Sequence, residues 1–169
     1  MLTVVLIVVV ILLVLVIVGP RLLSHDVAQW HVDPVTAAKP ASPNSYRAGE
    51  GPEALFDRDA PVFRVDASTL SSAWDAMIQK QPRVSIVADD RTSGSGPGVE
   101  GIVTYVQRSA FFGFPDYISV RFVDAGTFDD GAPASTLVVF SRSRLGESDL
   151  GVNEKRVNAW LAALEAELG

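Results

Sequence analysis

Residues 2–18 form an unbroken apolar run, LTVVLIVVVILLVLVIV, that contains no charged side chain. As an α-helix rising ~1.5 Å per residue, the run would span ~26 Å, close to the ~30 Å hydrocarbon core of a bilayer. Gly19, Pro20 and Arg21 end it. We therefore expect residues 1–21 to be a single-pass membrane anchor, with the lipid bilayer as partner of residues 2–18.

A cleaved secretory signal is the alternative for this run. Such a signal has a positively charged start, about 7–15 apolar residues and a small-x-small cleavage site. Here no Lys or Arg precedes the run, and the following residues, PRLLSHDV, offer no such site. An uncleaved anchor is therefore favoured. Arg21 and Lys39 follow the run, and this asymmetry favours a cytoplasmic domain.

The charge of the remaining chain limits its partners. All 14 basic and 20 acidic residues follow residue 20, which gives a formal charge of -6. Binding to nucleic acid through bulk charge requires a basic excess, so we expect no nucleic-acid partner. The absence of cysteine excludes disulfides, thiol nucleophiles and thiolate metal sites.

Residues 22–60 show neither helical nor strand periodicity. Six of the ten prolines lie between residues 20 and 61, and such a composition predicts an extended, semi-stiff tether. Trp30 would then be an interfacial anchor near the bilayer. His25 and His31 lie in the same segment without a further ligand, so we expect no metal there.

Residues 61–169 predict one globular α+β domain. The strand-like segments are 62–66, 83–90, 99–108, 116–124 and 135–144, and the helical ones are 70–79 and 152–168. This β-α-β-β-β-β-α order, with short loops between consecutive strands, predicts a mostly antiparallel sheet of about five strands with both helices on one face.

Two loop patterns are similar to cofactor or metal motifs but lack their context. Gly96, Gly98 and Gly101 have the G-x-G-x-x-G spacing, yet a strand pattern follows where a dinucleotide site requires a helix. The acidic pairs at 89–90 and 129–130 lack the spacing of a calcium loop. We therefore expect no metal and no cofactor.

Three aromatic residues occupy a predicted turn, where polar residues are usual. Phe111, Phe112 and Phe114 lie between the third and fourth strand segments of the sheet. One interpretation is an aromatic cluster folded over the end of the core. The other is an interaction loop that faces a protein partner at the membrane, or the membrane itself.

The segment 141–156, SRSRLGESDLGVNEKR, contains the candidate site residues Arg142, Arg144, Asp149, Asn153 and Arg156. The two arginines at 142 and 144 alternate on a strand and so share one face. In one interpretation, Asp149, Asp116 and Glu147 neutralise the three arginines and fasten the strand to the last helix. In the other, the guanidinium groups converge on the start of that helix and form an anion pocket.

The same residues carry a family resemblance. F-G-F-P-D-Y, followed by S-R-S-R-x-G-x-S-D-x-G-V-N-x-x-R-V and a Trp-Leu helix, resembles the domain of unknown function 1499 family over roughly residues 40–164. The resemblance implies a small protein that is membrane-anchored or exported. It implies no reaction and no catalytic residue.

We expect a non-enzymatic, membrane-anchored domain that binds a partner protein or a small anionic ligand near 141–156. The alternatives are a hydrolase that uses Ser141, Ser143 or Ser148 with an aspartate, and a purely structural envelope protein. A serine nucleophile needs an activating base. The predicted domain contains no histidine, which disfavours the hydrolase.

Overall fold

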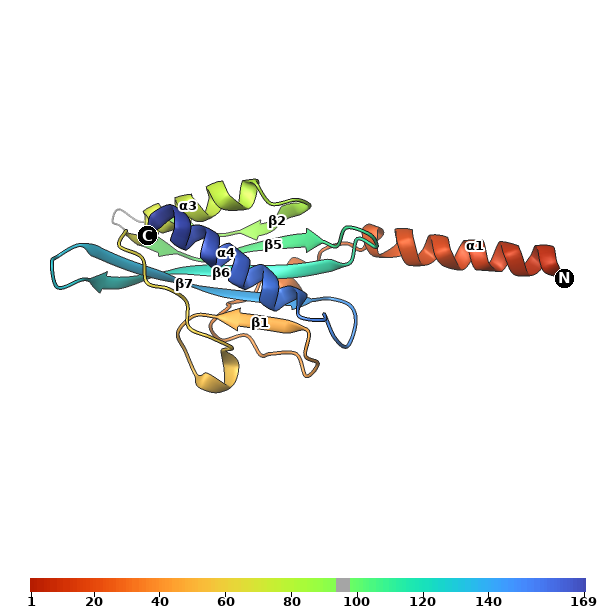
Figure 1. The fold of residues 1–169 in the computed structure, drawn as a ribbon, viewed down its shortest axis with the longest axis horizontal. Coiled ribbons are helices and arrows are strands. Elements are labelled where there is room, and N and C mark those ends of the chain that lie inside the picture. The colour runs from red at the N-terminus through yellow and green to blue at the C-terminus, as the bar shows by residue number, and fades with distance from the viewer. Residues whose placement is uncertain (94–97) are drawn as a thin grey trace.

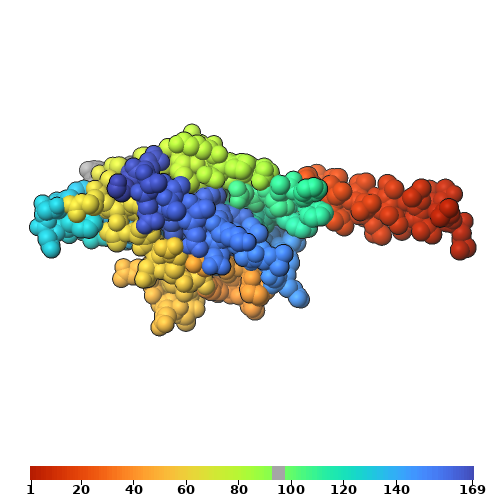
Figure 2. Space-filling model, in the orientation of Figure 1, coloured from red at the N-terminus to blue at the C-terminus, as the bar shows by residue number. Residues whose placement is uncertain are grey.

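The computed structural model describes residues 1–93 and 98–169 and has two clearly separate parts. Helix α1 (Leu2–Val18) projects from the domain, as Figures 1 and 2 show, and buries none of its residues in the protein. The 3-10 turn η1 (Gly19–Leu22) connects α1 to the domain, and its Pro20 is buried. Residues Leu2–Leu22 are long and apolar enough to cross a membrane. A hydrophobic helix that the protein itself does not cover needs another apolar environment.

The domain is built on a five-stranded antiparallel sheet of order β1-β7-β6-β5-β2. Its strands are β1 (Ser45–Ala48), β2 (Val84–Asp89), β5 (Val103–Arg108), β6 (Pro115–Thr127) and β7 (Pro133–Ser143). A separate two-stranded hairpin joins β3 (Thr92–Ser93) to β4 (Val99–Glu100). The predicted α+β class and the antiparallel sheet of five strands are confirmed.

Helices α3 (Ala67–Gln79) and α4 (Val152–Leu168) cover one side of the sheet, the helix face. The Trp74 and Trp160 rings meet edge to face with centroids 5.8 Å apart. Leu161 and Leu164 of α4 are almost fully buried against strands. Burial of each such side chain contributes ~1.5–3 kcal/mol, so this face holds the main core.

Residues 23–40 cover the opposite side of the sheet, which we call the N-terminal face. The short helix α2 (Val27–Trp30) brings the Trp30 ring onto Tyr117 of β6, stacked with centroids 4.0 Å apart. Trp30, Val106 and Tyr117 form a second, smaller core. The prediction that 22–60 is a tether and Trp30 a membrane anchor is therefore wrong, because this segment supplies β1 and covers apolar sheet surface.

One predicted strand is also wrong. Residues 62–66 form only a two-bond bridge between Phe63 and Ser135, since Asp66 already caps α3 by accepting a hydrogen bond from the Thr69 backbone. The edge strand is β1 instead. A 3-10 turn, η2 (Glu53–Leu55), follows β1. Of the predicted glycine loop, Gly96 lies outside the described residues.

Candidate functional site

The 141–156 motif is divided between the two faces of the sheet. Side chains alternate along β7, so Ser141 lies on the helix face, whereas Arg142 and the following Arg144 lie on the N-terminal face. Arg156, on α4, lies on the helix face. The structure therefore brings Arg142 and Arg144 together but separates both from Arg156.

Arg156 is the centre of a buried polar cluster on the helix face. Its guanidinium lies 2.5 Å from a carboxylate oxygen of Asp116, and the two side chains are only 7% and 11% exposed. It also donates hydrogen bonds to Gln107, Ser141 and the Asn153 amide oxygen. The positive charge thus has an ion-pair partner and three further acceptors, as a buried charge requires.

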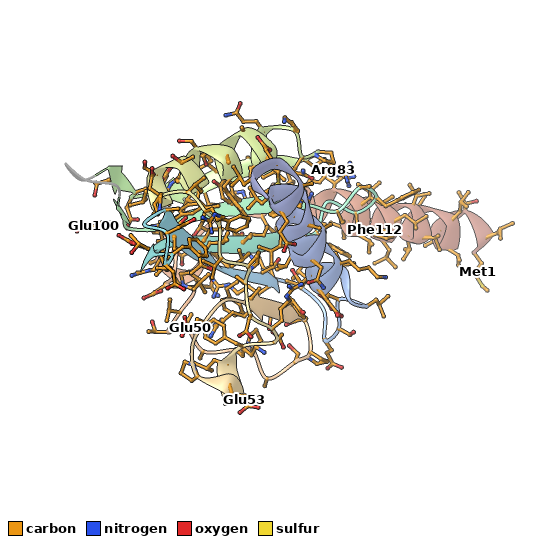
Figure 3. All side chains as sticks on the ribbon, turned by 60° about the vertical axis from the view of Figure 1, so that its left-hand side comes forward. Met1, Glu50, Glu53, Arg83, Glu100 and Phe112 are labelled. Atoms are coloured by element: carbon orange, nitrogen blue, oxygen red, sulfur yellow. The ribbon has the colours of Figure 1, made fainter. Side chains whose placement is uncertain are left out.

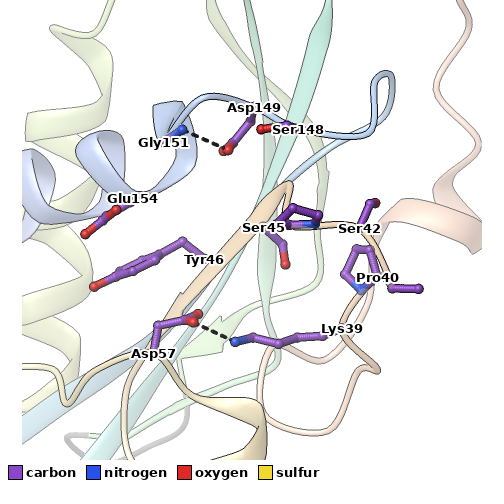
Figure 4. A pocket seen from close by; sticks show the side chains of 12 residues that line it. Lys39, Pro40, Ser42, Ser45, Tyr46, Asp57, Ser148, Asp149, Gly151 and Glu154 are labelled. Atoms are coloured by element: carbon purple, nitrogen blue, oxygen red, sulfur yellow. Dashed lines mark hydrogen bonds and ion pairs between the residues drawn. The ribbon is translucent and has the colours of Figure 1, made fainter.

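Asn153 and Asp149 extend this cluster to the start of α4. The fully buried Asn153 amide donates to the Asn44 carbonyl and to Asp149. The Asp149 carboxylate accepts hydrogen bonds from the backbone N–H groups of Gly151 and Asn153, the first of which is drawn in Figure 4. These contacts fasten α4 to the sheet, and within the described residues Asp149 forms no ion pair with any of the three arginines that it was expected to help neutralise.

On the N-terminal face, Arg142 is buried without a carboxylate partner among the described residues. It is 8% exposed, and its guanidinium donates to the Trp30 carbonyl at 2.7 Å. The same group lies over the rings of Trp30 and Phe140, at 5.0 and 5.2 Å from their centroids. Aromatic faces attract the cation but supply no negative charge.

Arg47 of β1 is a second buried guanidinium on this face, and sequence reasoning missed it. It is fully buried and lies 3.9 Å above the Phe140 ring, so that ring is contacted by both arginines. Its Nε and Nη1 atoms have no partner among the described residues. Burial and the neighbouring Arg47 lower the pKa of Arg142 to about 10; burial also lowers the pKa of Arg47.

A cavity of about 450 Å³ opens beside Arg142, and we call it the basic pocket. No acidic side chain lines it within the described part of the chain. Its lining includes Arg142, Arg144, Lys39 and Asn44. Arg144 donates to the Ser24 carbonyl, and the Lys39 ammonium lies 2.7 Å from Asp57. Neither Arg142 nor Arg144 has a carboxylate partner among the described residues, and of the two only Arg142 is buried.

Two other cavities differ from the basic pocket in charge. The cavity of about 480 Å³ in Figure 4 is lined by Asp57, Asp149 and Glu154 as well as Lys39. In the cavity of about 650 Å³ beside α3 and β2, Arg91 forms ion pairs with Asp75 and Asp89. Neither presents an uncompensated buried cation.

Both histidines lie on the domain, contrary to the expectation that it contains none. His31 Nδ1 is 3.0 Å from the Thr104 hydroxyl, and its Nε2 is 3.4 Å from an Asp90 oxygen. This hydroxyl–imidazole–carboxylate order is that of an activated nucleophile. Thr104 is fully buried, however, and its hydroxyl also bonds to Ser119, so a substrate has no access to it.

The predicted serine sites lie elsewhere. The Ser141 hydroxyl donates to Asn153 and accepts from Arg156. Ser143 accepts from Asn153, and Ser148 accepts from the Leu150 backbone. None of these contacts supplies a base. Within residues 1–93 and 98–169, no group of three His, Asp or Glu side chains is arranged to hold a metal ion.

The predicted interaction loop lies at the end of the domain that is nearest to α1. Phe112 stacks on Phe114 with centroids 5.3 Å apart, and Phe111 lies beside Phe112. Phe111 is 83% exposed and Phe112 41% exposed. The aromatic cluster is thus folded on itself and leaves the Phe111 ring largely uncovered and the Phe112 ring partly uncovered.

No curated protein matches the chain. A family model described as a protein of unknown function, DUF1499, matches residues 36–164. That span includes β1, α3, most of α4, the basic pocket arginines and the buried Arg156 cluster. Since the match covers well over half of the sequence, the chain belongs to the DUF1499 family.

Proposed function

We propose that this protein is a single-pass membrane protein whose domain binds a small oxyanion, such as a phosphate or carboxylate group, without catalysing a reaction. One observation carries the proposal: Arg142 is more than nine-tenths buried, lines the basic pocket and has no carboxylate partner among the described residues. A desolvated guanidinium of this kind gains most from an anion that supplies the missing charge and hydrogen-bond acceptors.

The neighbours of Arg142 fit the same ligand. Arg144 lines the pocket beside it, and Arg47 adds positive potential from behind Phe140. A guanidinium offers parallel N–H donors that match two oxygens of a carboxylate or phosphate. An oxyanion in the pocket would raise the pKa of Arg142 back toward its ordinary value.

The membrane part of the proposal is supported by α1. Seventeen apolar residues, none covered by the protein, have the length and composition of a spanning helix. Arg21 and Lys39 on the C-terminal side favour a domain in the cytoplasm. The hydrolase alternative is less well supported, because the only hydroxyl beside an imidazole and a carboxylate in the described residues is buried.

Thermal unfolding of the full chain in detergent, with and without inorganic phosphate at constant ionic strength, tests the oxyanion site. At a phosphate concentration of 100 times Kd, binding to the folded state alone adds ~2.7 kcal/mol to the free energy of unfolding. We expect Arg142→Met to abolish this gain. Arg64→Met is the matched control, because Arg64 pairs with Asp130 at an exposed site.

Two results would contradict the proposal. One is a wild-type melting temperature that does not respond to phosphate, sulfate or citrate at constant ionic strength. The other is an equal response in wild type and Arg142→Met. For the anchor, release of the full chain from membranes by alkaline carbonate would be the contrary result.

A further inference from the structure

The loop between β5 and β6 lies directly at the base of α1. The Arg21 guanidinium, three residues beyond α1, donates a 2.6 Å hydrogen bond to the Phe111 carbonyl. Arg108, the last residue of β5, donates to the carbonyls of Pro20 and Gly113. These bonds connect the chain leaving α1 with the phenylalanine loop.

Gly113 shows how close this connection is. Its φ is +70°, and a Cβ atom built there would lie 2.5 Å from the Arg21 side chain. A larger residue would therefore push Arg21 out of its position against the loop. The loop and the end of α1 consequently lie at the same level along the long axis of the molecule (Figure 1).

Exposed apolar side chains gather at this level. Leu22 is 77% exposed, Phe111 83% and Phe112 41%. If α1 spans the bilayer, its last residue, Val18, lies at the edge of the hydrocarbon core, and residues one turn further lie among the headgroups. The phenylalanine rings beside Arg21 then lie where amphipathic segments bury an apolar face.

The charges around the loop complement a phospholipid surface. Arg21, Arg83 and Arg108 line a cavity of about 490 Å³ beside the loop, and no acidic residue lines it within the described part of the chain. In Figure 3, Arg83 and Phe112 lie near the base of α1, whereas the labelled Glu50, Glu53 and Glu100 lie away from it. A chain with net charge -6 thus turns basic groups toward the membrane end.

We propose that the loop Ser109–Phe114, with Leu22 and the arginines Arg21, Arg83 and Arg108, is a membrane-docking surface. Phe111 and Phe112 insert at the headgroup boundary of the bilayer that α1 spans, and the guanidinium groups contact lipid phosphates. The end of the domain nearest α1 thereby contacts the bilayer surface directly. This inference rests on the anchor part of the proposed function and is independent of the basic pocket.

The natural absence of cysteine allows a direct test in the full chain. We would make three single-cysteine variants, Val10→Cys in α1, Phe111→Cys in the loop and Asp129→Cys in the exposed hairpin at the opposite end of the domain. Each would carry a nitroxide label in bilayers of phosphatidylcholine and phosphatidylglycerol. We expect labels at 10 and 111 to be accessible to oxygen and protected from a water-soluble nickel chelate, and the label at 129 to show the reverse.

The pattern of labels distinguishes the two proposals. A label at 111 that is accessible to the chelate, while the label at 10 is protected, overturns the docking surface alone and leaves the anchor. A label at 10 that is accessible to the chelate overturns the anchor and the docking surface with it. A third result would also exclude lipid as the occupant: in detergent, the label at 111 is protected from the chelate only when a protein partner is added.

The arginines are tested in the Phe111→Cys background. Each basic residue near an anionic surface favours contact by roughly fivefold. We therefore expect Arg83→Gln to lower the ratio of lipid-exposed to aqueous label by ~5-fold in phosphatidylglycerol-containing bilayers. Arg64→Gln, at the far end of the domain, is the control and should leave the ratio unchanged. Equal ratios in the two variants would overturn the role of the arginines.

Discussion

The two faces of the sheet each bury an arginine, but they surround its guanidinium group with different partners. On the helix face, Arg156 has a carboxylate at 2.5 Å and three further acceptors. On the N-terminal face, Arg142 has one backbone carbonyl and two aromatic rings. Both side chains are almost excluded from water, yet only one of them is neutralised.

This difference separates a structural role from a binding role within one sequence motif. In a buried ion pair the two charges already neutralise each other, so an added anion finds no unpaired positive charge to bind. Removing either partner leaves the other charge buried and unpaired. An unpaired buried guanidinium is incomplete, and an anion from solution can complete it. We therefore propose that the motif 141–156 supplies both a structural ion pair on the helix face and an anion site on the N-terminal face.

The largest expected effect comes from breaking the helix-face pair. Arg156→Met leaves the Asp116 carboxylate buried without its counter-ion, and such a loss typically lowers the free energy of unfolding by ~3–5 kcal/mol. Chemical denaturation of the full chain in detergent would measure it. Arg64→Met removes the exposed pair with Asp130 and should lower the free energy of unfolding far less, because solvent screens exposed charges.

Equal losses in these two variants would contradict the buried-pair interpretation. They would mean that water reaches Asp116 when Arg156 is removed. In that case the helix face would resemble an ordinary surface, and its difference from the N-terminal face would disappear.

A smaller loss is expected from Asn153→Ala, which tests whether the helix-face cluster depends on its amide. The fully buried Asn153 side chain joins Ser141, Arg156 and the Asn44 carbonyl. Removing it leaves buried polar groups unsatisfied, which lowers the free energy of unfolding by ~1–3 kcal/mol. Asn158→Ala on the same helix is the control, since its side chain accepts one hydrogen bond, from the exposed Arg58, within the described part of the chain. Similar losses in the two variants would argue against the cluster.

The sequence predicted the helix face better than the N-terminal face, and the reason is physical. The periodicity of α4 is a local pattern, so the helix and the face that it buries follow from residue spacing. Asp116 was among the expected partners of the arginines. By contrast, β1 has four residues in a proline-rich segment, and its pairing with β7 joins residues far apart in the chain. Local periodicity does not encode such a pairing, so Arg47 was missed.

The same limit explains Trp30 and the two histidines. Composition correctly described 22–60 as poor in regular structure, yet irregular segments can still cover a sheet. Tyr117, Val106 and Thr104 form the surface that receives Trp30 and His31. Only the assembled sheet presents these side chains on one face, so the sequence of the segment alone could not predict its position.

Arg142→Met is the matched counterpart of Arg156→Met and should behave differently. Burial and the neighbouring Arg47 lower the pKa of Arg142 to about 10, well below the ordinary value of an arginine, so its charge destabilises the folded state at any pH below about 10. Replacing Arg142 leaves no buried carboxylate without a counter-ion, and Met keeps apolar contact with Trp30 and Phe140. We expect a free energy of unfolding within ~1 kcal/mol of wild type, or higher.

The Trp30 carbonyl retains a partner in this variant, because the Ser119 hydroxyl also donates to it. Denaturation without phosphate would measure the change. A loss as large as that of Arg156→Met would show that the fold requires the Arg142 charge, and the two faces would then have the same role.

The smallest expected effect concerns His25, which titrates on the N-terminal face. Burial and the charges of Arg108 and Arg144 lower its pKa below the ordinary 6.5, and its Nδ1 atom lies 2.8 Å from the Tyr117 hydroxyl. Because the unfolded chain binds this proton more readily, stability is highest above pH 6.5 and decreases as the pH falls through that value and through the lower folded pKa.

His25→Gln should remove this part of the pH dependence, a change of less than ~1 kcal/mol for a partly exposed group. Denaturation of wild type and variant between pH 7.5 and pH 5.5 would measure the difference, where most carboxylates keep their charge. Stability curves that remain parallel over this range would show that the N-terminal face does not resist a further positive charge, and its excess of unpaired cations would then not influence stability.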